Sequence, residues 1–171
     1  RDRISVTCTA PSKTFNIASM MISNIFIPNR ELKAKFRAQL DAAGISQLNV
    51  LGLVACEAAY AHGEEWYEAM HSYVADNIAF TKEYVETQLP GVSMVDHEGT
   101  YLVWLDFRET GLSVDELEDL IVHRAKLWLD SGKIFGDCGK GFQRINVACP
   151  RATLQEALDR IKTALQESEA Q

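Results

Sequence analysis

A lysine stands in a short polar segment near the start of the chain, directly after a stretch with strand-like alternation. Residues 10–18 read APSKTFNIA, so the hydroxyl groups of Ser12 and Thr14 flank Lys13, and the amide of Asn16 follows. A lysine amine can attack a carbonyl group when desolvation or nearby charges and hydrogen bonds lower its pKa. The segment could therefore supply a nucleophilic amine, although a solvated loop lysine has the same composition.

A second residue with chemical potential is an arginine inside an apolar strand near the end of the chain. Residues 142–148 read FQRINVA, and strand alternation puts Ile145 and Val147 on one face and Arg144 on the other, with Phe142 and Asn146. An arginine in such surroundings needs a partner, because burying an unpaired charge is costly. Its planar fork suits a carboxylate. That carboxylate could belong to a ligand or to an Asp or Glu side chain of the chain itself.

The surrounding pattern predicts the elements that would hold these residues. Strands are expected at 4–9, 23–27, 101–107 and 142–148, and helices at 30–43, 51–61 and 64–89. Capping boxes at Ser113–Glu116 and Thr153–Glu156 predict two further helix starts. The glycine-rich segment 132–141 lacks the G-K-[ST] ending of a P-loop and is interpreted as a mobile loop.

The longest predicted element suggests how the chain is organised. Residues 64–89 contain no Gly or Pro, and Val74, Thr81 and Val85 lie on one helical face together with Tyr67, Met70 and Ile78. A helix of this length, about 40 Å, suits the connection between two domains. The residues after it have the pattern of a compact α+β unit.

Composition excludes several classes of function. The net charge of -7 argues against nucleic acid and against an anionic membrane surface as partners. No apolar run approaches the roughly 20 residues of a membrane helix, and the first residues contain no apolar signal core, so a cytoplasmic protein is expected. The four cysteines and four histidines have no metal-binding spacing, so no metal site is predicted.

Taken together, these segments resemble one enzyme family. Residues 12–18 (SKTFNIA), followed by 23–25 (SNI), resemble the cofactor-lysine segment of the MalY/PatB group of aminotransferase-like enzymes, which includes the carbon–sulfur lyases cystathionine β-lyase and cystalysin. Residues 142–151 (FQRINVACPR) look like the carboxylate-binding strand of that group, and 99–107 (GTYLVWLDF) also fit. The resemblance extends over essentially the whole chain, with the segments in the family's order.

The resemblance implies an α/β enzyme of fold type I that uses pyridoxal 5'-phosphate, usually as a homodimer. Lys13 would hold the cofactor as a Schiff base and then move the α-proton of the substrate, Arg144 would hold the α-carboxylate, and Ser12 would lie near the cofactor phosphate. The implied reaction is carbon–sulfur β-elimination from a sulfur-containing amino acid such as cystathionine or cysteine, which gives a thiol, pyruvate and ammonia. The alternatives are an aminotransferase of the same fold and a non-catalytic regulatory or interaction module.

The sequence departs from the family in extent and at two positions. Members of the group are much longer, so the chain is expected to be a C-terminal portion. Residues 1–75 would be the incomplete C-terminal part of the cofactor-binding large domain, and 76–171 the small α+β domain. Ser19 stands where the motif commonly has Gly, and Met21 where wider aminotransferases often have Arg. We expect the chain alone to be inactive, because the missing half would cover its apolar faces and supply most cofactor contacts.

Overall fold

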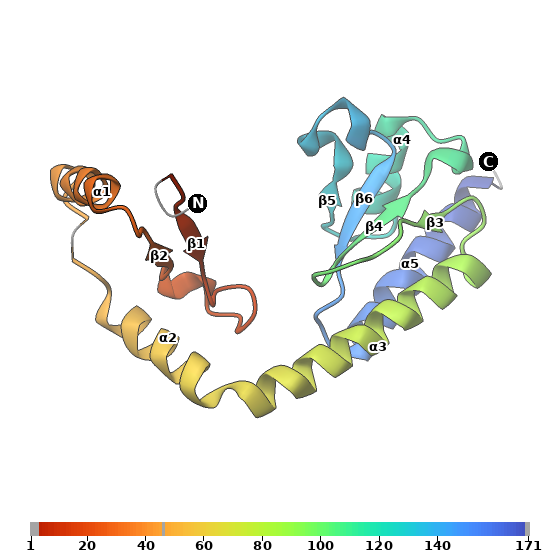
Figure 1. Cartoon of the computed structure of the whole chain (residues 1–171). Helices are drawn as coiled ribbons and strands as arrows, with labels where there is room; N and C mark the ends of the chain where they lie inside the picture. The colour runs from red at the N-terminus through yellow and green to blue at the C-terminus, as the bar shows by residue number, and fades with distance from the viewer. Residues whose placement is uncertain (1–3, 46, 170–171) are drawn as a thin grey trace. The chain divides into compact units, whose positions relative to one another are not determined.

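The computed structural model describes residues 4–45 and 47–169 and contains both helices and sheets, as the sequence predicted. It divides into two compact units, the first ending at Met70 and the second beginning at His71 (Figure 1). The sequence placed a domain boundary at about residue 75. That the units correspond to the two domains of an enzyme stays a prediction, and each unit is described by itself.

The first unit starts with a two-stranded antiparallel ladder. Strands β1 (Thr7–Thr9) and β2 (Asn24–Phe26) pair with Thr7 opposite Phe26. Both lie inside the predicted strands but are shorter than them. A turn and a 3-10 helix, Ala18–Met20, connect the two strands, and Met21 after the 3-10 helix has left-handed backbone angles.

Two helices follow, and asparagines start both. The side chain of Asn29 accepts hydrogen bonds from the amides of Glu31 (2.9 Å) and Leu32 (3.1 Å), which confirms the predicted cap. Asn49 caps the second helix in the same way and was not foreseen. These caps satisfy amides that a helix start leaves unpaired. The helices are α1 (Arg30–Ala42) and α2 (Val50–His62).

The first unit has almost no apolar core. Among its described residues Ile22, at 7% exposure, is the only large apolar side chain that is buried, and α1 buries none. Val50 and Leu51 on α2 are 69% and 68% exposed, and Ile4 and Met21 are 87% exposed. Exposed apolar surface of this kind normally marks an interface. The exposed apolar faces that the sequence predicted for this part are therefore present.

Helix α3 (Glu64–Gln88) begins in the first unit and continues into the second. Its 25 residues correspond to about 37 Å, and its bounds agree with the predicted helix 64–89. Val74, Thr81 and Val85 are buried as predicted. Asn77 is also buried on this face but was not predicted there, whereas the neighbouring Ile78 stays partly exposed. Apolar periodicity missed Asn77, because hydrogen bonds rather than apolar contacts satisfy its side chain.

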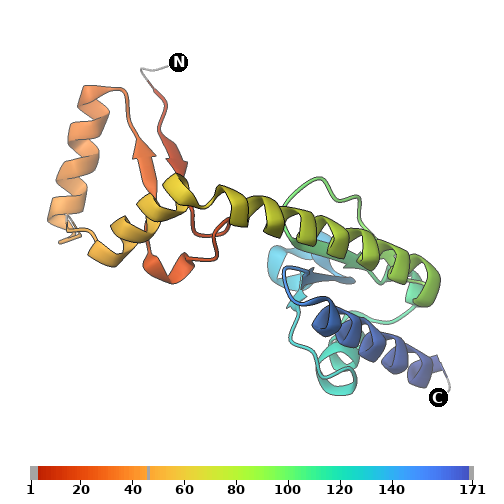
Figure 2. The ribbon, with the colours of Figure 1, turned by 90° about the horizontal axis from the view of Figure 1, so that it is seen from below.

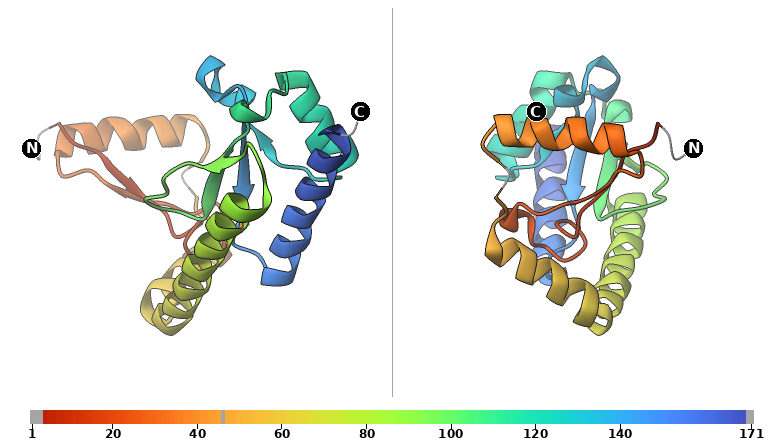
Figure 3. Two further views of the ribbon diagram at one scale, coloured as in Figure 1. Left: turned by 90° about the vertical axis from the view of Figure 1, so that its right-hand side faces the viewer. Right: turned by 60° about the vertical axis from the view of Figure 1, so that its left-hand side comes forward.

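The second unit is a four-stranded antiparallel sheet with helices on one face (Figures 2 and 3). Its strands lie in the order β3-β4-β6-β5, and one face of β4 and β6 is fully buried through Val103, Leu105, Ile145 and Gln143. The second half of α3 runs beside the last helix, α5, and the hydroxyl of Tyr84 on α3 donates to Asp159 on α5 (2.5 Å). The bounds are β3 Ser93–Met94, β4 Leu102–Asp106, β5 Asp130–Ser131, β6 Phe142–Asn146 and α5 Arg151–Glu169.

One of the two predicted capping boxes is correct and the other is wrong. Helix α4 (Val114–Asp119) starts with the Ser113–Glu116 box, in which both reciprocal hydrogen bonds form, and it continues into a π-helical turn, Leu120–Arg124. The final helix, in contrast, begins at Arg151, so Thr153 lies inside it. The carbonyl of Pro150 accepts from the amides of Thr153 and Leu154, and the hydroxyl of Tyr73 on α3 accepts from the amide of Arg151 (2.7 Å), so acceptors other than the Thr153 hydroxyl satisfy amides of the first turn.

Asn77 links three segments of the second unit. Its amide nitrogen donates to the carbonyls of Val147 (2.7 Å) and Cys149 (2.9 Å), and its oxygen accepts from Nε of Arg151 (2.7 Å). The residue is fully buried. The bonds join α3 to the segment between β6 and α5, and they thereby fix the end of the strand that carries Arg144.

Asn77→Ala should lower the free energy of unfolding of the second unit by about 2 to 3 kcal/mol, because two carbonyls and a guanidinium nitrogen lose their partner in a buried site. Urea-induced unfolding followed by circular dichroism measures this loss. The neighbouring exposed residue provides the control, and Asp76→Ala should stay within about 0.5 kcal/mol of the unmodified chain. Equal stabilities for the two variants would contradict the role given to Asn77.

Candidate functional site

Lys13 lies in a hydrogen-bonded turn of the first unit, immediately after β1. The amide of Phe15 donates to the carbonyl of Pro11 (2.9 Å), and the amide of Ile17 donates to that of Ser12 (3.0 Å). Asn16 has a φ of 53°, a left-handed conformation that asparagine adopts more readily than most residues. The Lys13 side chain is exposed and has no hydrogen bond or ion pair with any described residue. Backbone hydrogen bonds thus define the turn, and the amino group of Lys13 is accessible.

Phe15 anchors this turn on the junction between α2 and α3. Its ring stacks on Trp66 with centroids 5.9 Å apart and meets Tyr60 edge-on at 6.0 Å. Gly63, between the two helices, leaves room for this ring, since a Cβ there would collide with Phe15 and with the carbonyl of Ala59. Sequence reasoning missed this support. The only signal for it was the concentration of aromatic residues just after Gly63.

Ser12, next to Lys13, fits the same kind of ligand. It is half-buried, and its hydroxyl has no hydrogen bond with a described residue. A free primary amine is the group that an aldehyde cofactor binds covalently, and a hydroxyl is a suitable donor to a phosphate. The residues of this turn therefore fit pyridoxal phosphate. The roles given to Lys13 and Ser12 stay predictions.

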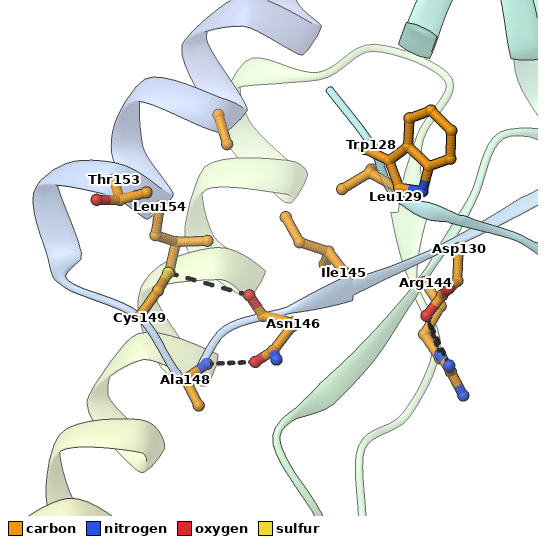
Figure 4. Close-up of a pocket in the computed structure, with 11 residues that line it drawn as sticks. Trp128, Leu129, Asp130, Arg144, Ile145, Asn146, Ala148, Cys149, Thr153 and Leu154 are labelled. Atoms are coloured by element: carbon orange, nitrogen blue, oxygen red, sulfur yellow. Dashed lines mark hydrogen bonds and ion pairs between the residues drawn. The ribbon is translucent and has the colours of Figure 1, made fainter. Parts of the chain in front are cut away.

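Arg144 lies in the second unit, on the face of the sheet that the helices leave open. It is the register partner of Trp104 on β4 and of Asp130 on β5, so the three residues form a row across the strands. Its Nη2 and Nε donate to Oδ2 of Asp130 at 2.6 and 3.2 Å (Figure 4). Its Cζ lies 4.6 Å from the ring centre of Phe135 and 5.8 Å from that of Trp104. The carboxylate that meets Arg144 in this structure thus belongs to the chain itself.

The glycine-rich segment before β6, interpreted from the sequence as a mobile loop, contains local helical structure. It forms two 3-10 helices, Gly132–Phe135 and Asp137–Gly139. Gly132 and Gly139 touch so closely that a Cβ on either would collide with the backbone of the other. The glycines are therefore required for close packing, which places Phe135 against Arg144.

Glu118 on α4 ties this segment to the sheet. One of its carboxylate oxygens accepts from Gln143 (2.8 Å), and the other pairs with Lys133 (3.2 Å). Burial opposes ionisation of this carboxyl, but hydrogen bonds from Ser131, Gln143 and Lys133 outweigh it and hold the pKa of Glu118 below its ordinary value. Since Ser131 follows Asp130 directly, this contact also steadies the strand opposite Arg144.

A hollow of about 320 Å³ lies between the end of β6 and the start of α5 (Figure 4). Arg144 and Asp130 line one end of it, and Cys149 lies at the other. Burial raises the pKa of the Cys149 thiol, which favours the less nucleophilic neutral form. Within the described part of the chain, no group of three or more His, Cys, Asp or Glu side chains could hold a metal ion, and no helix is long and apolar enough to cross a membrane.

The architecture is that of fold-type I pyridoxal-phosphate enzymes, the class that includes the aminotransferases. Cystalysin from Treponema denticola, whose crystal structure contains pyridoxal 5'-phosphate, superimposes with a TM-score of 0.92 at 38% identity. The match covers 97% of this chain and 42% of the cystalysin chain. No family model matches the sequence.

Curated relatives narrow the class to one group. The chain is 44% identical to cystathionine β-lyase PatB of Bacillus subtilis, over 95% of this chain and 42% of that protein. It is 30% identical to protein MalY of Escherichia coli, over 88% of this chain and 39% of that protein. The homologues of this chain are thus the MalY/PatB cystathionine β-lyases and cystalysin-like enzymes, and it matches them as a fragment, over about two-fifths of their length. Aminotransferases are also among its relatives.

The lowered pKa of Glu118 makes the second unit sensitive to acid. A carboxyl whose pKa is lower in the folded than in the unfolded state stabilises the fold at pH values above its ordinary pKa, here 4.5, and this contribution is lost as the pH falls through the folded-state pKa. Thermal unfolding measured from about pH 6 downwards should therefore show a smaller loss of Tm below pH 4.5 in Glu118→Gln than in the unmodified chain. Glu98→Gln, at an exposed site, is the control for removal of one charge. If Tm falls with pH in the same way in all three proteins, the stabilising role given to the Glu118 carboxylate is contradicted.

Proposed function

We propose that this chain is part of a pyridoxal-phosphate-dependent carbon–sulfur β-lyase, which we call the parent enzyme. The observation that carries the proposal is the 44% identity to cystathionine β-lyase PatB over 95% of the chain. The free amine of Lys13 in its fixed turn supports it, because this is the group that such a cofactor requires. The proposed substrates are cystathionine or cysteine, and the products are a thiol, pyruvate and ammonia.

The residues of the chain take three roles in this proposal. Lys13 would hold the cofactor through its Nζ and would act as the base that takes the proton from the substrate Cα. Arg144 holds the α-carboxylate and so orients the Cα–H bond toward that base. Ser12 donates to the phosphate. Pyridoxal phosphate, when bound, supplies an electron sink for the charge left at Cα. In the net reaction the Cβ–S bond would break, the sulfur would leave as a protonated thiol, and one water would supply the keto oxygen of pyruvate while the nitrogen leaves as ammonia.

An aminotransferase of the same fold is the second candidate, because aminotransferases are among the relatives. The two reactions share the removal of the α-proton and differ in the next step. In the lyase, a thiol leaves from Cβ. In the aminotransferase, the bond to the Cβ substituent would stay intact and a keto acid would accept the amino group.

The remaining features of the parent enzyme stay predictions. We propose that the unit ending at Met70 is part of its large domain and that the unit beginning at His71 is its small domain. We also propose that the parent enzyme is a homodimer, as the family resemblance implies, and that it is cytoplasmic. The exposed apolar side chains of α2 support the expectation that the chain alone binds the cofactor weakly and is inactive.

Purified parent enzyme incubated with cystathionine should form pyruvate without an added keto acid, and Lys13→Ala should lower kcat by more than about a thousandfold, because the same amine holds the cofactor and moves the proton. Lys82→Ala, at an exposed position of α3 in the second unit, is the matched control and should keep its activity. The chain alone should form no pyruvate.

Turnover only in the presence of a keto acid would favour the aminotransferase. Unchanged turnover in Lys13→Ala would contradict both enzyme proposals. A protein without turnover whose partner binding survives Lys13→Ala would instead be a regulatory or interaction module.

A further inference from the structure

The ion pair between Arg144 and Asp130 uses only one edge of the guanidinium group. Nε and Nη2 both donate to the same oxygen, Oδ2 of Asp130. Among the described residues, none accepts a hydrogen bond from Nη1. A guanidinium presents five N–H groups, enough for two separate paired contacts. The outer edge, formed by Nη1 and the second hydrogen of Nη2, is therefore left for another acceptor.

The surroundings of Arg144 hold this arrangement from three sides. Asp130 and Trp104 are its direct neighbours across the two adjacent strands, and directly opposed residues share one face of a sheet. Phe135 covers the guanidinium, and its ring meets Trp104 edge-on with centroids 5.1 Å apart. The Arg144 side chain is 23% exposed, so part of it still reaches solvent. The site is thus a fixed arginine with one open side.

We propose that Asp130 is a positioning residue for the carboxylate-binding arginine, which it grips along the Nε edge so that the Nη1–Nη2 edge faces an incoming carboxylate. This inference rests on the proposed function, in which Arg144 binds the α-carboxylate. Stability alone is a weak reason for the pair, because Asp130 is 47% exposed and ion pairs of such exposure contribute about 0 to 1 kcal/mol. Instead, Asp130 holds the guanidinium group of Arg144 in one orientation, which an unpaired, flexible arginine would not keep.

The negative charge of Asp130 should weaken substrate binding, whereas its positioning of Arg144 should strengthen it. Variants of Asp130 can therefore distinguish the two roles. The negative charge of Asp130 repels an incoming carboxylate, so a purely electrostatic role predicts that Asp130→Asn and Asp130→Ala both lower KM. A positioning role predicts a different result. Asp130→Asn keeps an oxygen that accepts from Nε and Nη2, whereas Asp130→Ala removes it.

In the parent enzyme, Asp130→Ala should raise KM for the amino-acid substrate roughly tenfold with kcat within about twofold, and Asp130→Asn should stay within about threefold of the unmodified KM. Asp106→Ala is the matched control, because Asp106 holds Arg108 through the same nitrogen atoms on the same sheet. A second measurement is independent of activity. In the ¹⁵N-labelled chain, the Nε–H signal of Arg144 should exchange slowly with solvent in the unmodified chain and in Asp130→Asn, and quickly in Asp130→Ala.

The KM of Arg144→Lys distinguishes a wrong role for Asp130 from a wrong role for Arg144 in the proposed function. If Arg144→Lys raises KM while Asp130→Ala leaves KM and the Nε–H exchange unchanged, the positioning role is overturned and the carboxylate role of Arg144 stands. If both Asp130 variants lower KM, the role of Asp130 is electrostatic and positioning is again overturned. If Arg144→Lys leaves KM unchanged, the carboxylate role itself is wrong, and the inference falls with it.

Discussion

The hydrogen bonds of one buried side chain, Asn77, determine how the second unit is assembled. They join α3 to the two carbonyls that come after β6 and to the first residue of α5. Without them, the end of β6 would place unpaired polar groups in the core, at a cost comparable to a large part of a domain's stability. The position of Arg144 depends on this clamp, because Arg144 lies three residues before the first bonded carbonyl, on a strand whose other face is buried.

The two units differ in how they are stabilised, and this bears on function. Apart from Pro11 and Ile22, every buried apolar side chain among the described residues belongs to the second unit. The first unit relies on turn bonds, two asparagine caps and the aromatic contacts of Phe15. These local interactions hold the turn of Lys13 but leave α1 and α2 uncovered. The homologues are more than twice as long as this chain, and in our proposal the remainder of the parent enzyme covers these helices and supplies the other cofactor contacts.

The sequence predicted much of the local structure, because the patterns it used have local causes. The Asn29 cap, the Ser113 capping box and the alternation around Arg144 all depend on neighbouring residues, and all three are confirmed. The start of α5 was predicted wrongly, because the helix begins two residues earlier, where the carbonyl of Pro150 and the hydroxyl of the sequence-distant Tyr73 accept from its first amides. Lys13 and Arg144 stood out through their combination, whereas Asn77, Phe15 and Asp130 did not. The roles of Asn77, Phe15 and Asp130 arise from contacts with residues distant in sequence, and no local sequence pattern signals such contacts.

The most direct test of this account is to identify the lysine that holds the cofactor. Parent enzyme saturated with pyridoxal phosphate would be reduced with borohydride and digested, and the modified peptide sequenced by mass spectrometry. The account predicts stoichiometric modification of Lys13 alone. Modification of another lysine, with Lys13 unmodified, would contradict it.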